Sequence, residues 1–201
     1  MNGITEVFFV RHGESECNRQ GRAAGWFQTP LSELGREQAR KTGELLADME
    51  FDRVYSSDLV RAMETCALAL PGVEPQLSEL LREIDVGRLR NQSTAEARAQ
   101  FPYEYSIVQK YRDFSPFGGE SHHVAQDRVF RFVETELNTL PEDSRVAVFC
   151  HLGTVLYMLN YVLGQEIDRR ALQMNNAAVF KFIRLKSGRW QLAGWNTTGK
   201  L

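Results

Sequence analysis

Two short apolar runs, each ending at a histidine with a glycine close behind it, constrain the fold of this 201-residue chain most. The first run, Val-Phe-Phe-Val at residues 7–10, leads into Arg-His-Gly at 11–13. The second, Val-Ala-Val-Phe-Cys at 146–150, leads into His-Leu-Gly at 151–153. A short, continuously apolar run suits a strand that is buried on both faces of a parallel sheet. If the two strands are neighbours, their histidines meet at the carboxyl edge of the sheet, where α/β proteins bind ligands.

Strands and helices alternate along the rest of the chain. Apolar runs predict further strands at 53–56, around 76–80, at 179–185 and at 190–195, the last two forming a hairpin. Helices are predicted from Ser32 onward and at 58–70, 121–140 and 154–163, with a short one where a capping-box pattern occurs at 93–96. This alternation predicts an α/β fold with three αβα layers, whose mostly parallel central sheet carries an antiparallel strand toward the C-terminus. Residues 1–201 are expected to form one domain, with a lid-like insertion at about 88–120.

The composition excludes several classes of protein. Charged residues make up 25% of the chain, but the signs nearly cancel at a formal net charge of -2, unlike the basic balance of a general nucleic-acid binder. There is no apolar run of about 18 residues and no recognisable targeting signal, so we expect a cytoplasmic protein without a membrane span. The three cysteines are far apart, which argues against a disulfide framework. The adjacent His122 and His123 lack a supporting carboxylate pair, so no metal site is expected.

Several charged side chains suggest anion chemistry at the predicted sheet edge. A helix that begins behind His151 would supply unpaired N–H groups and a positive dipole end, which favour an anion and disfavour imidazolium. His12 would then be neutral and able to act as a nucleophile. Arg11 and Arg61 are suited to clamp a phosphoryl group, because guanidinium binds its oxygens in a bidentate manner. Glu83 is the candidate general acid, and Asp85 is its rival.

At this point the chain resembles the histidine phosphatase superfamily, in its phosphoglycerate mutase-like branch. The motifs that carry the resemblance follow one another in order: Arg11-His12-Gly13-Glu14-Ser15, Asn18, Leu31-Ser32-x-x-Gly35-x-x-Gln38-Ala39, Ser56-Ser57-x-x-x-Arg61-Ala62-x-x-Thr65, Leu81-x-Glu83-x-x-x-Gly87, Gly119-Glu120-Ser121 and His151-x-Gly153. A lone Arg-His-Gly is a weak signal, whereas the ordered set is specific. Leu152 departs from the pattern, because the second histidine of such proteins usually precedes Gly-Gly.

The resemblance implies a role for each matching residue. His12 would carry the phosphoryl group as phosphohistidine, and Glu83 would supply a proton to the leaving group. The phosphate clamp would consist of Arg11, Arg61 and His151. Further substrate-binding positions are expected at Asn18, Ser15, Gly153 and Leu152, with Lys110 and Arg112 reaching a second anionic group. Neither a metal nor an organic cofactor is implied.

Three functions are compatible with these residues. The first is a histidine acid-type phosphatase that hydrolyses a small phosphorylated metabolite through a phosphohistidine intermediate. The alternative is a cofactor-dependent phosphoglycerate mutase, which would usually carry a longer and more basic insertion between Glu83 and His151. The third is a non-catalytic module that binds phospho-ligands on the same fold, against which the presence of all five main groups argues. Neither nucleic acid nor a membrane is expected as a partner, and a homodimer is left open.

Overall fold

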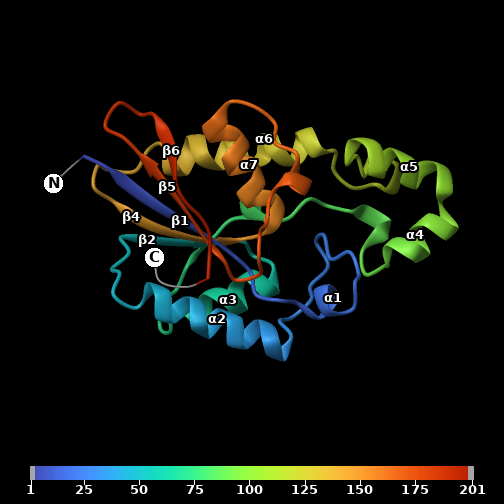
Figure 1. The fold of residues 1–201 in the computed structure, drawn as a ribbon, viewed down its shortest axis with the longest axis horizontal. Coiled ribbons are helices and arrows are strands. Elements are labelled where there is room, and N and C mark those ends of the chain that lie inside the picture. Colours follow the sequence, from blue (N-terminus) through green and yellow to red (C-terminus); the bar gives the residue numbers. More distant parts are fainter. Residues whose placement is uncertain (1–2, 199–201) are drawn as a thin grey trace.

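A six-stranded sheet forms the centre of the computed structural model, which describes residues 3–198 (Figure 1). The strand order is β3-β2-β4-β1-β5-β6. The strands are β1 (Thr5–Arg11), β2 (Arg53–Ser56), β3 (Gln76–Leu77), β4 (Arg145–Cys150), β5 (Val179–Arg184) and β6 (Trp190–Thr197). The first four strands run parallel, while β5 pairs antiparallel with both β1 and β6. This arrangement confirms the predicted mostly parallel sheet with an antiparallel element near the C-terminus.

Helices cover both faces of this sheet (Figure 1). On one face lie α2 (Glu33–Leu46) and α3 (Val60–Ala69), and on the other lie α6 (His122–Phe132) and α7 (Leu152–Leu163). The three predicted layers are therefore present. The remaining helices, which lie beyond the carboxyl end of β1, are α1 (Glu16–Arg19), α4 (Thr94–Gln100) and α5 (Pro102–Tyr111). No helix within residues 3–198 is both long and apolar enough to cross a membrane.

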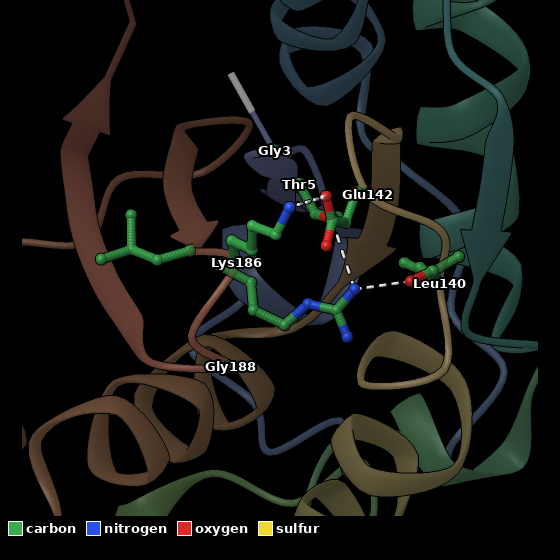
Figure 2. A pocket seen from close by; sticks show the side chains of 8 residues that line it. Gly3, Thr5, Leu140, Glu142, Lys186 and Gly188 are labelled. Atoms are coloured by element: carbon green, nitrogen blue, oxygen red, sulfur yellow. Dashed lines mark hydrogen bonds and ion pairs between the residues drawn. The ribbon is translucent and has the colours of Figure 1, made fainter. Parts of the chain in front are cut away.

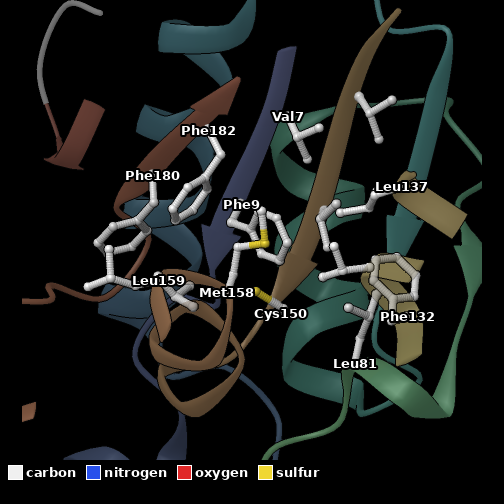
Figure 3. Packing of buried hydrophobic residues seen from close by; sticks show 14 of the residues in the cluster. Val7, Phe9, Leu81, Phe132, Leu137, Cys150, Met158, Leu159, Phe180 and Phe182 are labelled. Carbon is white, nitrogen blue, oxygen red and sulfur yellow. The ribbon is translucent and has the colours of Figure 1, made fainter. Parts of the chain in front are cut away.

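The apolar run of β1 is continuous because both faces of the strand are buried. Phe9 packs with Phe180, Phe182 and Met158 in the core beneath α7, as Figure 3 shows. Phe8 points to the opposite core, against α2 and α3. Successive side chains of a strand alternate between the faces of a sheet, so a strand with helices on both sides needs apolar residues at every position.

Two predicted elements end earlier in the structure than the sequence indicates. The strand expected at 76–80 stops at Leu77, because Ser78 caps a short 3₁₀ turn at Glu79–Leu81. The helix expected at 121–140 gives way after Phe132 to a wider π-helical turn, in which the Asn138 N–H donates to the Val133 carbonyl five residues back.

The region at 88–120 holds more helix than the sequence indicates. The capping box at Ser93 begins α4 as predicted, but a second helix, α5, follows directly because Pro102 suits a first helical position. A small separate core holds these helices together, and it consists of Val86, Leu89, Ala97, Val108 and Phe117.

Candidate active site

The parallel pairing of β1 with β4 brings the two histidines together. Arg11 lies opposite Cys150 in the ladder, and the His12 N–H donates to the Cys150 carbonyl at 2.9 Å. Each histidine is thus the first residue beyond its strand, and their ring centroids are 5.2 Å apart. His151 is also the N-cap of α7, which begins two residues earlier than the sequence predicts.

His12 is a neutral imidazole with a defined tautomer. Its Nδ1 lies 2.6 Å from the Gly13 carbonyl oxygen, which can only accept, so Nδ1 carries the proton. Its Nε2 accepts from the Arg61 Nε–H at 3.2 Å. Burial, reinforced by the positive charges of Arg61 and Arg11, holds the pKa of His12 well below its ordinary value. Nε2 is therefore unprotonated and carries the lone pair that nucleophilic attack requires.

Arg61 is a buried cation whose position is fixed by backbone oxygens. Its side chain comes from the first turn of α3, is 1% exposed and donates to the carbonyls of Gly25 at 2.9 Å and Phe27 at 3.2 Å. Burial lowers its pKa to about 10, and the charge of Glu83 opposes that shift. The guanidinium therefore remains charged at neutral pH.

Two further buried nitrogens flank His12. Arg11 donates from one terminal nitrogen to the Met174 carbonyl, while its Nε has no hydrogen-bond partner within residues 3–198. The Nδ1 of His151 likewise has no partner in that part of the chain. Burial lowers the pKa of Arg11 to about 10, so this residue too stays cationic at neutral pH. Buried polar atoms normally have partners, and two such atoms beside one neutral histidine mark this place as a site for an anion.

Glu83 lies against the N-terminus of α7, beside His151. Its Oε2 accepts from the Gly153 N–H at 3.2 Å, and its Oε1 accepts from the Ile84 N–H at 2.9 Å. Asp85, the rival acid, instead pairs with Arg90 through contacts of 3.0 and 2.6 Å. The geometry therefore favours Glu83 as the carboxylate that could reach a bound phosphoryl group.

An ion pair between Arg128 and Glu120, which no sequence pattern relates to Glu83, holds the loop of Glu83. Arg128 on α6 contacts both carboxylate oxygens of Glu120 at 2.9 Å. The same guanidinium donates to the backbone carbonyls of Leu80, Arg82 and Glu83. The indole N–H of Trp26 also donates to the Glu83 carbonyl, at 2.7 Å. These bonds fix the main chain from which the Glu83 carboxylate projects.

Glycines place the turn behind His12 directly on the backbone of α2. A Cβ on Gly13 would lie 2.4 Å from the Gly35 carbonyl oxygen, and a Cβ on Gly35 would lie 2.0 Å from the Glu14 carbonyl oxygen. Real Cβ atoms do not approach other atoms so closely, so only glycine fits either position.

The other predicted substrate-binding residues lie around this centre in different roles. Ser15 is buried and caps α1, where its hydroxyl donates to the Asn18 Oδ1 at 3.1 Å, while Asn18 itself is exposed. Leu152 is half-buried at the first position of α7. Lys110 lies over the ring of its exposed neighbour Tyr111, with the nitrogen 4.8 Å from the ring centroid.

Arg112, in contrast, carries a charge that acts on groups of α6 and α7. Burial raises the pKa of Tyr157 on α7, and the positive charge of Arg112 opposes that shift. Burial lowers the pKa of His122 on α6, and the charge of Arg112 adds to the effect. His122 also lies 3.3 Å from the Tyr157 hydroxyl and 3.5 Å from a Glu166 carboxylate oxygen. Of the two cations predicted to bind a second anionic group, Arg112 is therefore the one whose charge acts on a group of α7.

A hollow elsewhere on the molecule does not offer comparable chemistry (Figure 2). It lies beside Thr5, the first residue of β1, and so at the opposite end of that strand from His12. Its cations are engaged within the protein: Arg184 donates to the Leu140 carbonyl, and Lys186 lies 3.7 Å from Glu142.

Gly153→Ala is expected to lower kcat by about 100-fold, because a misplacement of about 1 Å in a catalytic group can cost that much. An added Cβ would lie 2.2 Å from the Glu83 Oε1 and would push the carboxylate away. Steady-state kinetics of Gly153→Ala, Glu83→Ala and the double variant form a cycle. If Gly153 acts through Glu83, its substitution should cause little further loss of kcat in the Glu83→Ala protein. Additive losses would contradict this explanation.

The free energy of unfolding is expected to fall as the pH drops below about 6.5. His12 and His151 are buried, and burial holds both pKa values well below the unfolded value. Below that unfolded pKa the denatured chain binds protons that the folded chain does not, which costs on the order of 1 kcal/mol per histidine per pH unit. Above it, both states are neutral and the contribution vanishes. Denaturant titrations at several pH values give the free energy of unfolding as a function of pH. In His12→Gln this free energy should fall less steeply below about pH 6.5, and an unchanged pH dependence would refute the lowered pKa of His12.

Comparisons with known proteins agree with this geometry. The model of the histidine phosphatase superfamily (branch 1) matches residues 7–198. A 2,3-bisphosphoglycerate-dependent phosphoglycerate mutase of Azorhizobium caulinodans is 37% identical over 178 residues, which are 83% of this chain and 86% of that protein. The corresponding mutase of Rhizobium meliloti is 34% identical over 180 residues, 85% of each chain.

Solved structures with the same fold include those of phosphatases. A mycobacterial glucosyl-3-phosphoglycerate phosphatase in complex with VO3 is 28% identical, with a TM-score of 0.76 over 96% of this chain and 98% of that one. The alpha-ribazole phosphatase from Shigella flexneri has a TM-score of 0.87 over 97% and 98% of the two chains, and at 22% identity its likeness concerns the fold alone. This chain belongs to the histidine phosphatase superfamily, and the proteins similar to it include phosphoglycerate mutases and a phosphatase.

Proposed function

We propose that this protein is a phosphomonoesterase that hydrolyses a small phosphorylated metabolite through a phosphohistidine at His12. The observation that supports it most is the unprotonated Nε2 of a buried, neutral His12, held beside the cations Arg61 and Arg11. A phosphate monoester would be drawn to those charges, and the same charges keep the imidazole neutral. An anion and a neutral nucleophile are thus favoured in one place.

In the first step, the His12 Nε2 gives up its hydrogen bond from Arg61 and attacks phosphorus in line with the ester oxygen. The P–N bond forms while the P–O bond breaks, and the leaving alkoxide takes a proton from the Glu83 carboxyl group. Arg11, Arg61 and His151 stabilise the charge that spreads over the three other phosphoryl oxygens. Because Nδ1 keeps its proton and donates it in a hydrogen bond to the Gly13 carbonyl, the intermediate is phosphorylated on Nε2.

In the second step, water attacks the phosphohistidine. The Glu83 carboxylate takes a proton from that water, which restores the carboxyl group used in the first step. The P–N bond breaks, its electron pair returns to Nε2, and inorganic phosphate leaves. Glu83 and His12 end the cycle as they began, so the net reaction is hydrolysis of the ester.

A phosphoglycerate mutase is the second candidate, and the names of the two rhizobial relatives favour it. In that reaction a second hydroxyl group, rather than water, would accept the phosphoryl group. These mutases align with this chain over 83–86% of either sequence, so the likeness extends over most of both chains.

The charges in the insertion argue for hydrolysis. Arg88 lies over the rings of Phe101 and Phe117, and Arg90 pairs with Asp85. We take the region at 88–120 as a cover over the site, with Arg112 as its contribution to binding a second anionic group of the substrate. A basic surface that could hold a bisphosphate cofactor is not expected from these pairings.

The test is an assay of phosphate release from a panel of phosphorylated metabolites that includes 3-phosphoglycerate and an aryl phosphate. Hydrolysis predicts inorganic phosphate from at least one ester and none from the His12→Asn protein. Conversion of 3-phosphoglycerate to 2-phosphoglycerate without phosphate release would instead identify a mutase. Binding of phosphate esters without turnover would identify a non-catalytic module and would overturn the proposal.

A further inference from the structure

A buried serine lies behind the second histidine of the site. The Ser57 hydroxyl oxygen is 2.8 Å from the His151 Nε2, and both residues are fully buried. They are placed by adjacent strands, since Ser57 directly follows β2 and its N–H donates to the Phe149 carbonyl of β4 at 2.9 Å. The contact is therefore part of the sheet edge that carries the site.

The surroundings of Ser57 decide which partner donates. Its oxygen already accepts the Leu59 N–H at 3.3 Å, so the hydroxyl proton still needs an acceptor. Within residues 3–198, the His151 Nε2 is the acceptor within hydrogen-bond distance. If the imidazole instead donated from Nε2, the buried hydroxyl proton would be left unsatisfied, which costs free energy. The balance of donors and acceptors therefore favours a bond from serine to histidine.

The same conclusion follows from the charge state of His151. Burial, reinforced by the charges of Arg61 and other cations around it, holds the pKa of His151 well below its ordinary value. A neutral imidazole carries one proton, and the bond made by one ring nitrogen determines which nitrogen holds it. With Nε2 accepting from Ser57, the proton lies on Nδ1, the buried nitrogen that has no partner within residues 3–198.

We propose that Ser57 is a positioning residue that fixes the tautomer of His151, so that Nδ1 offers an N–H donor to the phosphoryl group at His12. This rests on the proposed function for the identity of the anion, whereas the tautomer itself does not depend on it. The opposite tautomer would turn a lone pair toward a phosphoryl oxygen and would repel it. A serine that never touches the substrate thus decides whether the second histidine attracts or repels the transferred group.

The experiment compares histidine tautomers by long-range ¹H–¹⁵N correlation spectra of the ¹⁵N-histidine-labelled protein and of Ser57→Ala. The His151 signals are assigned by their loss in His151→Asn. We expect the proton on Nδ1 in the parent protein and a shift toward Nε2 in Ser57→Ala, with kcat/KM lowered on the order of 10- to 100-fold, as for loss of a hydrogen bond to a charged group.

Ser56→Ala is the matched control. Ser56 is equally buried, but its hydroxyl donates to the Ser57 carbonyl rather than to the site. It should leave the tautomer and kcat/KM unchanged. A parent protein with the proton on Nε2, or a Ser57→Ala protein with an unchanged tautomer, would overturn the role of Ser57. Spectra as expected from a protein that turns over no phosphate ester would uphold that role and reject the proposed function.

Discussion

Replacing His12 with asparagine is expected to reduce kcat by on the order of 10⁵-fold, because loss of a catalytic nucleophile has effects of that size. Asparagine retains a polar side chain but has no ring nitrogen with a free lone pair. The Arg61 guanidinium would remain in place through its bonds to Gly25 and Phe27. Substrate binding should therefore survive better than turnover, and KM should change far less than kcat.

Two measurements check this result. Steady-state phosphate release gives the loss of kcat, and quenching with ³²P-labelled substrate detects the intermediate as a protein-bound label that is stable in alkali and lost in acid. His123→Asn is the control, since His123 is an exposed histidine on α6. It should keep both activity and label. A His12→Asn protein that still acquires the label would place the nucleophile elsewhere.

Glu83→Gln is expected to produce a loss that depends on the leaving group. An alkyl phosphate needs a proton on its departing oxygen, so its turnover should fall by about 10²- to 10⁴-fold, the usual contribution of a general acid. An aryl phosphate with an acidic phenol leaves without that proton, and its first step should be nearly unaffected. The second step still needs a base, so this substrate should give a burst of phenol followed by slow turnover.

Rapid-quench kinetics with the two kinds of substrate separate these steps. Glu79→Gln is a suitable control, because Glu79 lies in the same loop with its side chain 75% exposed and contacts Arg82 rather than Gly153. It should preserve the full rates with both substrates. Equal losses in the rate of the first step for alkyl and aryl phosphates in Glu83→Gln would show that Glu83 does not protonate the leaving group.

The layers and the main strands could be predicted because their signals are local. The run at 7–10 within β1 and the run at 146–150 within β4 are apolar at every position, which reflects burial on both faces. The end of β3 and the start of α5 were harder to predict from the sequence. They depend on single residues, Ser78 and Pro102, in short segments where polar and apolar residues are mixed. The π-helical turn after Phe132 has no signature in the spacing of apolar residues, which continues across it.

The identity of the site residues could be predicted better than their partners. The motifs around His12, Arg61 and His151 are contiguous in the sequence, so resemblance finds them. Arg128 holds the main chain of Glu83 from 45 residues away, and no local pattern relates the two. Ser57 belongs to a recognised motif, yet its bond to His151 spans 94 residues and depends on the pairing of β2 with β4. Such partners follow from the tertiary structure alone.

The close backbone contact between Gly13 and Gly35 has a consequence for the substitutions that this protein can accept during evolution. Main chain touches main chain there, so no side chain lies between the turn behind His12 and helix α2. If the region at 88–120 covers the site as proposed, substitutions there would alter which ester is admitted without shifting that turn. In variants selected for activity on a new substrate, the substitutions should therefore lie far from these two glycines. Almost any replacement of either glycine should be absent from the selected variants.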